Sequence, residues 1–219
     1  MAINYNHSKE EADSLQKEIG ANKGAAILVQ GDISRSEDVS KIVQETMNAW
    51  GRIDILVNNA GIHYSVDIFD HTEKMWDETI DINLKGTYLC SKAVAPIMLQ
   101  QKKGKIINIS SNSGMYHPSA MRFSEYVASK AGMNGLTKAL ALRLGPYVNV
   151  NAICPGAIAT EMNAYRNAEA NKALIAETPL KRIGTVEDVA NAAVFLASDM
   201  SDFITGELML VAGGRGMHQ

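Results

Sequence analysis

The sequence predicts a doubly wound α/β fold, in which helices cover both faces of a mostly parallel sheet. Short apolar runs of strand length alternate with longer amphipathic segments along the chain, as is typical of parallel strands joined by helical crossovers. The 219 residues, 46% hydrophobic and 21% charged, suffice for one sizeable core but not for two independent ones. We therefore expect a single domain over residues 1–219.

Six apolar segments predict the strands of this Rossmann-like sheet, the last of them at its edge. They are residues 2–5, 25–29, 54–57, 105–110, 148–153 and 207–211. The run at 25–29 contains no polar residue, which predicts burial on both faces. The strand at 148–153 is expected to end at Cys154-Pro155-Gly156, because proline cannot donate a ladder hydrogen bond and glycine permits a turn.

Helical patterns separate the strands. Ser8 and Glu11 predict a capping box at the start of a helix that runs to about residue 19. Ser36 is expected to cap the next helix, whose large apolar residues recur at helical spacing and belong in the core. These residues are Val39, Val43, Met47 and Trp50.

Further helical patterns follow in the second half of the chain. Helices are expected at about 72–101, 124–144 and 186–196. The long segment from Gly156 to about Gly184 shows no such pattern, and its methionine and tyrosine content favours a lid over a linker.

Composition excludes several function classes. A formal charge of −3 and a pI near 6.0 give no general attraction to nucleic acid. No apolar stretch approaches the length of a membrane span, and the N-terminus lacks the pattern of a secretory signal, so we expect a cytoplasmic protein. Cys90 and Cys154 are interpreted as reduced packing residues. The five histidines show no metal-ligand spacing, so no metal site is predicted.

Residues with catalytic chemistry follow the predicted strands. Tyr126 and Lys130 lie one helical turn apart, Ser111 follows the strand at 105–110, and Asn58-Asn59-Ala60-Gly61 closes the strand at 54–57. The spacing of a tyrosine and a lysine in an Ala/Lys-rich helix is by itself more often a solvated face. Its context favours a site, since open α/β sheets bind ligands at the carboxyl ends of their strands.

With these motifs in this order, the chain resembles the short-chain dehydrogenase/reductase family, in the classical branch that includes 3-oxoacyl-[acyl-carrier-protein] reductases and glucose dehydrogenases. The resemblance runs from Ala2 nearly to the end. It rests on Asn58-Asn59-Ala60-Gly61, Asn83, Ser111, Tyr126 to Lys130, Pro155-Gly156 with Thr160, and Thr205-Gly206 with Gly213-Gly214. The family resemblance implies the fold and an oxidoreductase chemistry.

Carbonyl reduction needs a donor that can give a proton to the developing alkoxide. Tyr126 is the candidate acid, and the Lys130 ammonium would bring the pKa of its phenol, ordinarily about 10, closer to working pH. Ser111 can donate to the same oxygen; alternatively, it only caps a turn. The resemblance implies that Asn83 holds a water near Lys130. Without the resemblance, an asparagine between two helices is more often a helix break or cap. In reverse, Tyr126 becomes the base for alcohol oxidation.

The resemblance also implies a dinucleotide site. Asp32 and Ile33 match an adenine contact, and Asn59, Ala60 and Gly61 a stretch beside the ribose. The catalytic Tyr126 and Lys130 also belong to this site, and the nicotinamide contacts match Pro155, Gly156, Ile158 and Thr160. Asn6, His7 and Ser8 present no carboxylate where a ribose hydroxyl would be held, so NADP(H) is favoured over NAD(H).

One unit of the family has no counterpart in the sequence: the opening strand, the glycine-rich phosphate turn and the helix after it. We therefore expect an N-terminally truncated sheet, in which the strands at 2–5 and 54–57 either pair directly or are bridged by another chain. Residues 213–216 are glycine-rich but follow the last strand and are interpreted as a tail.

Two functions remain open. The first is NADP(H)-linked reduction of a small or medium carbonyl, and the second is a cofactor-free descendant that serves as a scaffold or as a hydrolase using Ser111. Four residues either line the substrate pocket or only cover the start of the helix at 124–144, namely Met115, Tyr116, His117 and Met121, and the candidates for the other wall of the pocket are Met162 and Tyr165. A homodimer or homotetramer is expected through helices near 84–101 and 124–144, where Ala131, Gly132 and Gly135 allow close approach.

Overall fold

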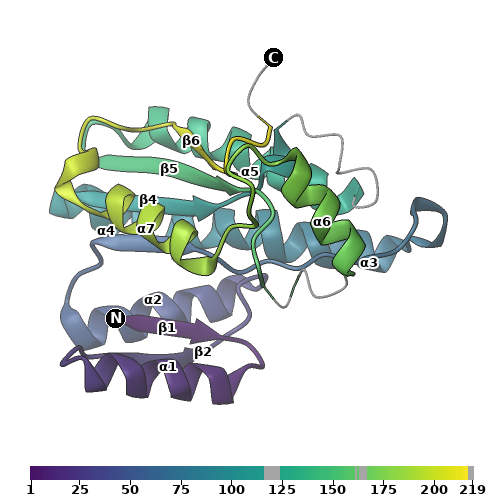
Figure 1. Cartoon of the computed structure of the whole chain (residues 1–219). Helices are drawn as coiled ribbons and strands as arrows, with labels where there is room; N and C mark the ends of the chain where they lie inside the picture. Colours follow the sequence, from purple (N-terminus) through teal and green to yellow (C-terminus); the bar gives the residue numbers. More distant parts are fainter. Residues whose placement is uncertain (116–123, 161, 163–166, 217–219) are drawn as a thin grey trace.

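The chain folds into strands and helices that alternate as the sequence predicts (Figure 1). The structure is a computed structural model, and it describes residues 1–115, 124–160, 162 and 167–216. The elements in these ranges are β1 (Ala2–Tyr5), α1 (Lys9–Ala21), β2 (Ile27–Gln30), α2 (Ser36–Trp50), β3 (Ile55–Asn58), α3 (Glu73–Ile80), α4 (Thr87–Gln101), β4 (Gly104–Ile109), α5 (Ser124–Leu144), β5 (Val148–Pro155), α6 (Ala168–Glu177), α7 (Val186–Ala197) and β6 (Leu208–Val211). A π-helical segment, η2 (Asp81–Gly86), joins α3 to α4, and short 3-10 turns occur at η1 (Ile68–Asp70), η3 (Asn112–Gly114) and η6 (Asp199–Ser201).

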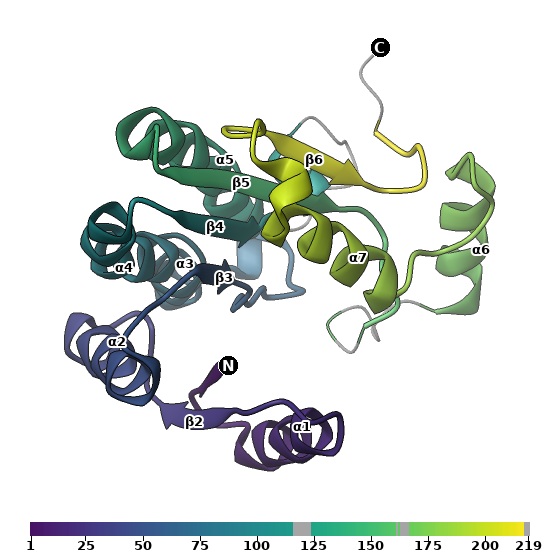
Figure 2. The ribbon, with the colours of Figure 1, turned by 90° about the vertical axis from the view of Figure 1, so that its left-hand side faces the viewer.

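The strands form two parallel sheets rather than one. β1 pairs with β2, and a second sheet has the order β3-β4-β5-β6. Within the described residues β1 and β3 do not pair, so the first of the two alternatives, direct pairing, is wrong. Helices α2, α4 and α5 lie on one side of the strands and α1 and α7 on the other, which confirms the doubly wound arrangement (Figure 2).

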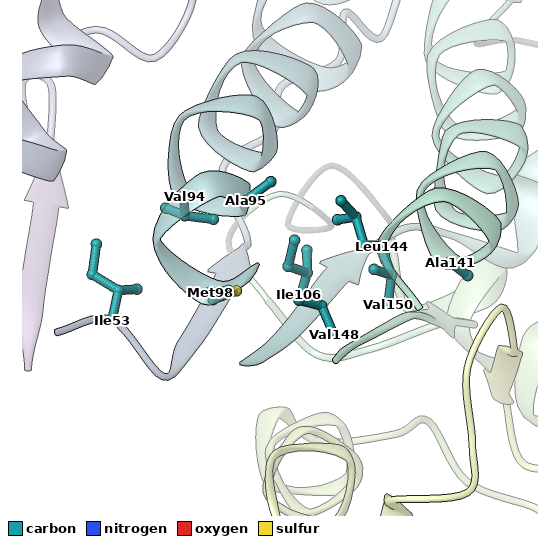
Figure 3. Packing of buried hydrophobic residues seen from close by; sticks show 9 residues of the cluster. All are labelled: Ile53, Val94, Ala95, Met98, Ile106, Ala141, Leu144, Val148 and Val150. Carbon is teal, nitrogen blue, oxygen red and sulfur yellow. The ribbon is translucent and has the colours of Figure 1, made fainter. Parts of the chain in front are cut away.

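The main core lies between the larger sheet and helices α4 and α5 (Figure 3). Met98, Ile106 and Val150 are completely buried there, and Val43 and Met47 of α2 pack against the same cluster. The other face of the sheet forms a second cluster with α7, around residues such as Ile107 and Ile153. β4 is therefore buried on both faces, as expected of a central parallel strand.

Four local expectations about the first half of the chain are corrected. The Ser8 side chain makes no capping hydrogen bond, and Ser36 is the first residue of α2 rather than its cap. β2 is an edge strand in which only Val29 is buried. Trp50 ends α2 and is 38% exposed, so it does not belong to the core.

The second half differs from expectation mainly after β5. That strand extends through Cys154 to Pro155, which pairs with Val211 of β6. Helix α6 occupies part of the segment that was expected to be irregular, and Asn167 caps its N-terminus. None of the helices in the described ranges is both long and apolar enough to cross a lipid bilayer.

Candidate active site

Helix α5 brings Tyr126 and Lys130 to the carboxyl end of the larger sheet. The Lys130 Nζ atom lies 5.5 Å from the centroid of the Tyr126 ring. It donates a 2.7 Å hydrogen bond to the carbonyl oxygen of Ile109, the last residue of β4. A methyl group built on Gly61 would lie 3.4 Å from Nζ, so the loop after β3 also passes close to the ammonium. The three elements together confine the Lys130 side chain.

Burial changes the electrostatics of Lys130. Its side chain is nearly inaccessible, and burial lowers the pKa of its ammonium from 10.5 to about 8. The group still carries a charge at neutral pH, and a charge in this surrounding acts strongly on a nearby phenol because solvent screens it little. The site therefore contains the phenol and the ammonium that proton transfer to a carbonyl oxygen requires.

Asn83 lies in the π-helical segment η2 and is completely buried. Its Oδ1 atom accepts a 2.8 Å hydrogen bond from the Ile62 N–H, and its Nδ2 atom donates to the Ile62 carbonyl and to Ser129 Oγ. Ser129 in turn donates to the Tyr126 carbonyl. Since π-helical turns are frequent at functional sites, this geometry supports a positioning role. The Asn83 side chain links the loop after β3 to α5.

Ser111 follows β4 and is buried. Its Oγ atom accepts a 3.1 Å hydrogen bond from the Ser113 N–H and so caps η3. A hydroxyl that accepts one hydrogen bond keeps its own proton for donation, so capping and substrate contact are compatible. Gly114, three residues on, packs so tightly on the Lys130 backbone that an added Cβ would lie 2.6 Å from its carbonyl carbon.

The residues matched to the nicotinamide end lie around the end of β5. Gly156 donates its N–H to the Val211 carbonyl, and Ile158 forms an isolated bridge with Gly184. Thr160 is exposed at the end of this stretch. Asn59 and Ala60 are exposed directly after β3, whereas Gly61 is partly buried beside Asn83 and Lys130.

The residues matched to the adenosine end belong to the smaller sheet. Asn6, His7 and Ser8 are exposed after β1. Asp32 follows β2, and its Oδ1 atom accepts hydrogen bonds from the N–H and hydroxyl of Ser34. Partial burial raises the pKa of Asp32, but these hydrogen bonds lower it further, so the carboxyl pKa lies below its ordinary value. Ile33 packs closely on Gly86.

Some residues near the site carried no signal in the sequence. The His63 ring packs edge-on against the Tyr126 ring with 5.8 Å between centroids. Glu125 is completely buried and lies 3.0 Å from His71. Neither histidine stands in a recognisable motif. The one signal that could have identified His63 is its place two residues after the strand-end motif Asn58-Asn59-Ala60-Gly61.

Several expected pocket residues cannot be placed. Met115 is partly buried, and Met162 is 40% exposed. The others, Tyr116, His117, Met121 and Tyr165, lie outside the described residues. A shallow groove between β2 and α2, lined by residues such as Ile27 and Lys41, contains none of the expected site residues.

A nicotinamide dinucleotide fits one half of this site better than the other. The buried Lys130 and the backbone at Gly61, close to Tyr126, offer donors and acceptors that could hold a nicotinamide riboside. Between β1 and β3 of the described chain, no glycine-rich turn opens a helix that could hold a pyrophosphate. The dinucleotide is thus the cofactor to consider at this site. Cys90 and Cys154 are buried free thiols, and among the described residues no cluster of potential metal ligands occurs.

Comparison with known proteins gives consistent matches along the chain. The family model described as enoyl-(acyl carrier protein) reductase matches residues 1–216. The 3-oxoacyl-[acyl-carrier-protein] reductase of Staphylococcus epidermidis is 38% identical over 219 residues, which cover 99% of this chain and 88% of that protein. The corresponding reductase of Synechocystis sp. is 41% identical, with 99% and 87% covered.

Solved structures show the same relationship. A gluconate 5-dehydrogenase from Burkholderia cenocepacia, in complex with NADP and tartrate, superposes with a TM-score of 0.90 at 32% identity. The match covers 97% of this chain and 84% of that one. A 3-oxoacyl-[acyl-carrier protein] reductase from Brucella melitensis superposes with a TM-score of 0.89 at 34% identity, and 99% of this chain and 82% of that chain are covered.

Proposed function

Because the chain belongs to the short-chain dehydrogenase/reductase family, we propose that it reduces a small or medium carbonyl compound with NADP(H) and with Tyr126 as the acid. The observation that carries this proposal is the position of the Lys130 ammonium, 5.5 Å from the Tyr126 ring centroid and buried against Ile109. Few other arrangements favour loss of a proton from a phenol near neutral pH. In the reverse direction Tyr126 accepts the proton of an alcohol.

Each of the expected site residues has a different role in proton transfer. When bound, the dinucleotide supplies the hydride. Tyr126 then gives its hydroxyl proton to the carbonyl oxygen, and the charge of Lys130 stabilises the phenolate that remains. Ser111 donates a second hydrogen bond to that oxygen while its Oγ atom continues to accept the hydrogen bond from the Ser113 N–H. Asn83 fixes the Ile62 backbone and, through Ser129, the start of the catalytic helix.

The relatives support a choice of substrate and cofactor for the first assays. Two relatives carry the name 3-oxoacyl-[acyl-carrier-protein] reductase, so a 3-oxoacyl thioester is the carbonyl class to test first. The gluconate 5-dehydrogenase holds NADP, and the stretch Asn6-His7-Ser8 after β1 contains no carboxylate that would repel a 2′-phosphate.

Tyr126→Phe tests the proposal directly. We expect the variant to lose carbonyl reduction by about a hundredfold or more, because phenylalanine cannot donate the proton. The assay follows NADPH consumption, after a fluorescence titration has established that NADPH binds. Tyr147→Phe is the matched control, since Tyr147 precedes β5 at the opposite end of the sheet. Retained turnover in Tyr126→Phe would show that the acid is assigned wrongly.

A second candidate function is that of a cofactor-free descendant. The observation that favours it is the buried Ser111 hydroxyl, which accepts the Ser113 N–H and keeps its own proton, so that it could act without a cofactor. Such a protein would serve as a scaffold or would hydrolyse esters with Ser111. Ester hydrolysis that Ser111→Ala abolishes and NADPH does not affect would favour the hydrolase, and absence of NADPH binding at millimolar concentration would exclude the reductase.

We also propose self-association through α4 and α5. Gly135 of α5 has open space above its Cα atom, and Leu142 on the same helix is 89% exposed. Gly132, by contrast, already packs against Leu84 within the chain. Light scattering of the purified protein should give the mass of a dimer or tetramer, and a monomer mass would overturn this proposal.

A further inference from the structure

A buried acid–base pair that carbonyl reduction does not require lies one residue before Tyr126. Oε2 of Glu125 is 3.0 Å from Nε2 of His71, and the two side chains are 0% and 7% exposed. Oε1 of Glu125 accepts a 3.3 Å hydrogen bond from the Tyr64 N–H. Tyr64 and His71 both belong to residues 61–71, here named the β3–α3 loop. One carboxylate therefore ties two points of this loop to the first turn of α5.

The pair lacks the geometry of a hydrogen bond, although Nε2 and Oε2 are close. A carboxylate taken fully out of water is costly unless a cation or donors compensate it, and His71 with the Tyr64 N–H are the compensating groups shown here. Loss of His71 would take one of these two compensating groups from the buried Glu125, and loss of Glu125 would take its partner from the buried His71, so the contact favours one position of the loop.

The same loop contacts the reacting groups. Asn83 holds both the N–H and the carbonyl of Ile62. The His63 ring packs edge-on against the Tyr126 ring. The next residue, Tyr64, donates its N–H to Glu125 and its hydroxyl to Glu78 of α3. The residue that packs on the phenol is thus adjacent in sequence to a residue that Glu125 holds.

We propose that Glu125 and His71 are positioning residues, which fix the β3–α3 loop and thereby the packing of His63 against Tyr126. This inference rests on the proposed function for its catalytic consequence, because Tyr126 acts there as the acid. Neither residue touches the reacting atoms, and both act through the loop. The geometry of the loop itself can be measured whether or not the protein reduces a carbonyl.

The test uses Glu125→Gln and His71→Gln, which roughly keep side-chain size and remove the carboxylate and the imidazole respectively. Hydrogen exchange of the amides at residues 62–64 should become about tenfold faster in both variants, because the loop opens more often. For carbonyl reduction, kcat should fall about tenfold while KM for NADPH stays within about twofold, since the loss concerns orientation and not binding. The double variant should lose no more than either single one.

Asp199→Asn is the control, because it removes a carboxylate from an exposed ion pair with Lys103, near the start of β4. It should change neither exchange nor kcat. Unchanged exchange in the β3–α3 loop of both variants would overturn the inference, and so would an equal fall in kcat in Asp199→Asn. If Glu125→Gln does not fold, His71→Gln decides alone. If the wild type reduces no carbonyl, the proposed function fails. The exchange measurement still decides whether Glu125 and His71 position the β3–α3 loop.

Discussion

Lys130 is the residue whose environment departs most from what its sequence motif specifies. Burial lowers the pKa of its ammonium to about 8. Below that pH the charge is present and favours the phenolate that reduction leaves on Tyr126; above it the charge is lost. We therefore predict that kcat/KM for carbonyl reduction falls as pH rises through about 8. A pH–rate profile from pH 6 to 10 checks this, and a flat profile between pH 7 and 9 would contradict it.

The pH dependence of the free energy of unfolding tests the same lowered pKa of Lys130. The unfolded chain holds the Lys130 proton up to the ordinary pKa of 10.5, whereas the folded chain releases it near 8. Between these values the unfolded state binds more protons, so this group makes the folded state more stable as pH rises, by about 3 kcal/mol over the window. Lys130→Met should lack that increment when its urea unfolding is compared with that of the wild type at pH 7 and pH 10.

At the residue scale, the sequence predicts the reacting groups better than their supports. Tyr126 and Lys130 stand at a helical spacing, and Ser111 follows a strand, so pattern alone places them on one edge of the sheet. Glu125 and His71 are 54 positions apart and meet only because the β3–α3 loop folds back onto α5. No periodicity encodes a contact made by a loop.

At the element scale, helix starts show what a sequence pattern leaves open. Ser8 and Thr185 are both hydroxyl residues followed three positions later by an acid. In the structure only Thr185 forms the capping box, with Asp188 of α7. Asp188 also binds Arg182, and this ion pair helps to hold the carboxylate in place. The pattern of residue types is the same, but tertiary context decides whether the box closes.

This difference yields a paired prediction. Thr185→Ala should lower the free energy of unfolding by about 1 kcal/mol, because the Asp188 N–H at the start of α7 loses its acceptor. Ser8→Ala should change it by less than about 0.5 kcal/mol, because Ser8 makes no side-chain cap. Urea unfolding with a common m value measures both. An equal loss of unfolding free energy in the two variants would contradict the structure, in which Thr185 caps its helix and Ser8 does not.

Over the whole molecule, the sequence predicts every strand but not how the strands divide between sheets. Apolar runs identify strands because each buries side chains, whereas pairing depends on neighbours that a run does not specify. Leu56 of β3 packs toward the main core, while Ile55 and Val57 on the opposite side of the strand are 45% and 46% exposed. On that side α7 covers β4 and β5, whereas the helix that packs against β3 is α4, on the side of the main core (Figure 2).

The divided sheet predicts two levels of stability. β1 and β2 form a four-residue pair supported by α1 and α2, and only α2 reaches the main core, through Val43 and Met47. A two-stranded sheet is marginal by itself. We predict that backbone amides of β2 exchange with solvent at least about tenfold faster than those of β4, which is buried between two strands and two helix layers.

Ligand binding should reduce this difference in exchange if the proposed function holds. The expected adenosine contacts, Asn6, His7, Ser8 and Asp32, all lie at the ends of β1 and β2, so a dinucleotide that touches them is bound only while the smaller sheet is folded. NADPH should therefore slow exchange in β2 more than in β4, in proportion to its saturation. Protection confined to the residues around Tyr126 would instead mean that the nicotinamide half binds alone. Such binding would be weak, because the smaller sheet would contribute nothing to the binding free energy of NADPH.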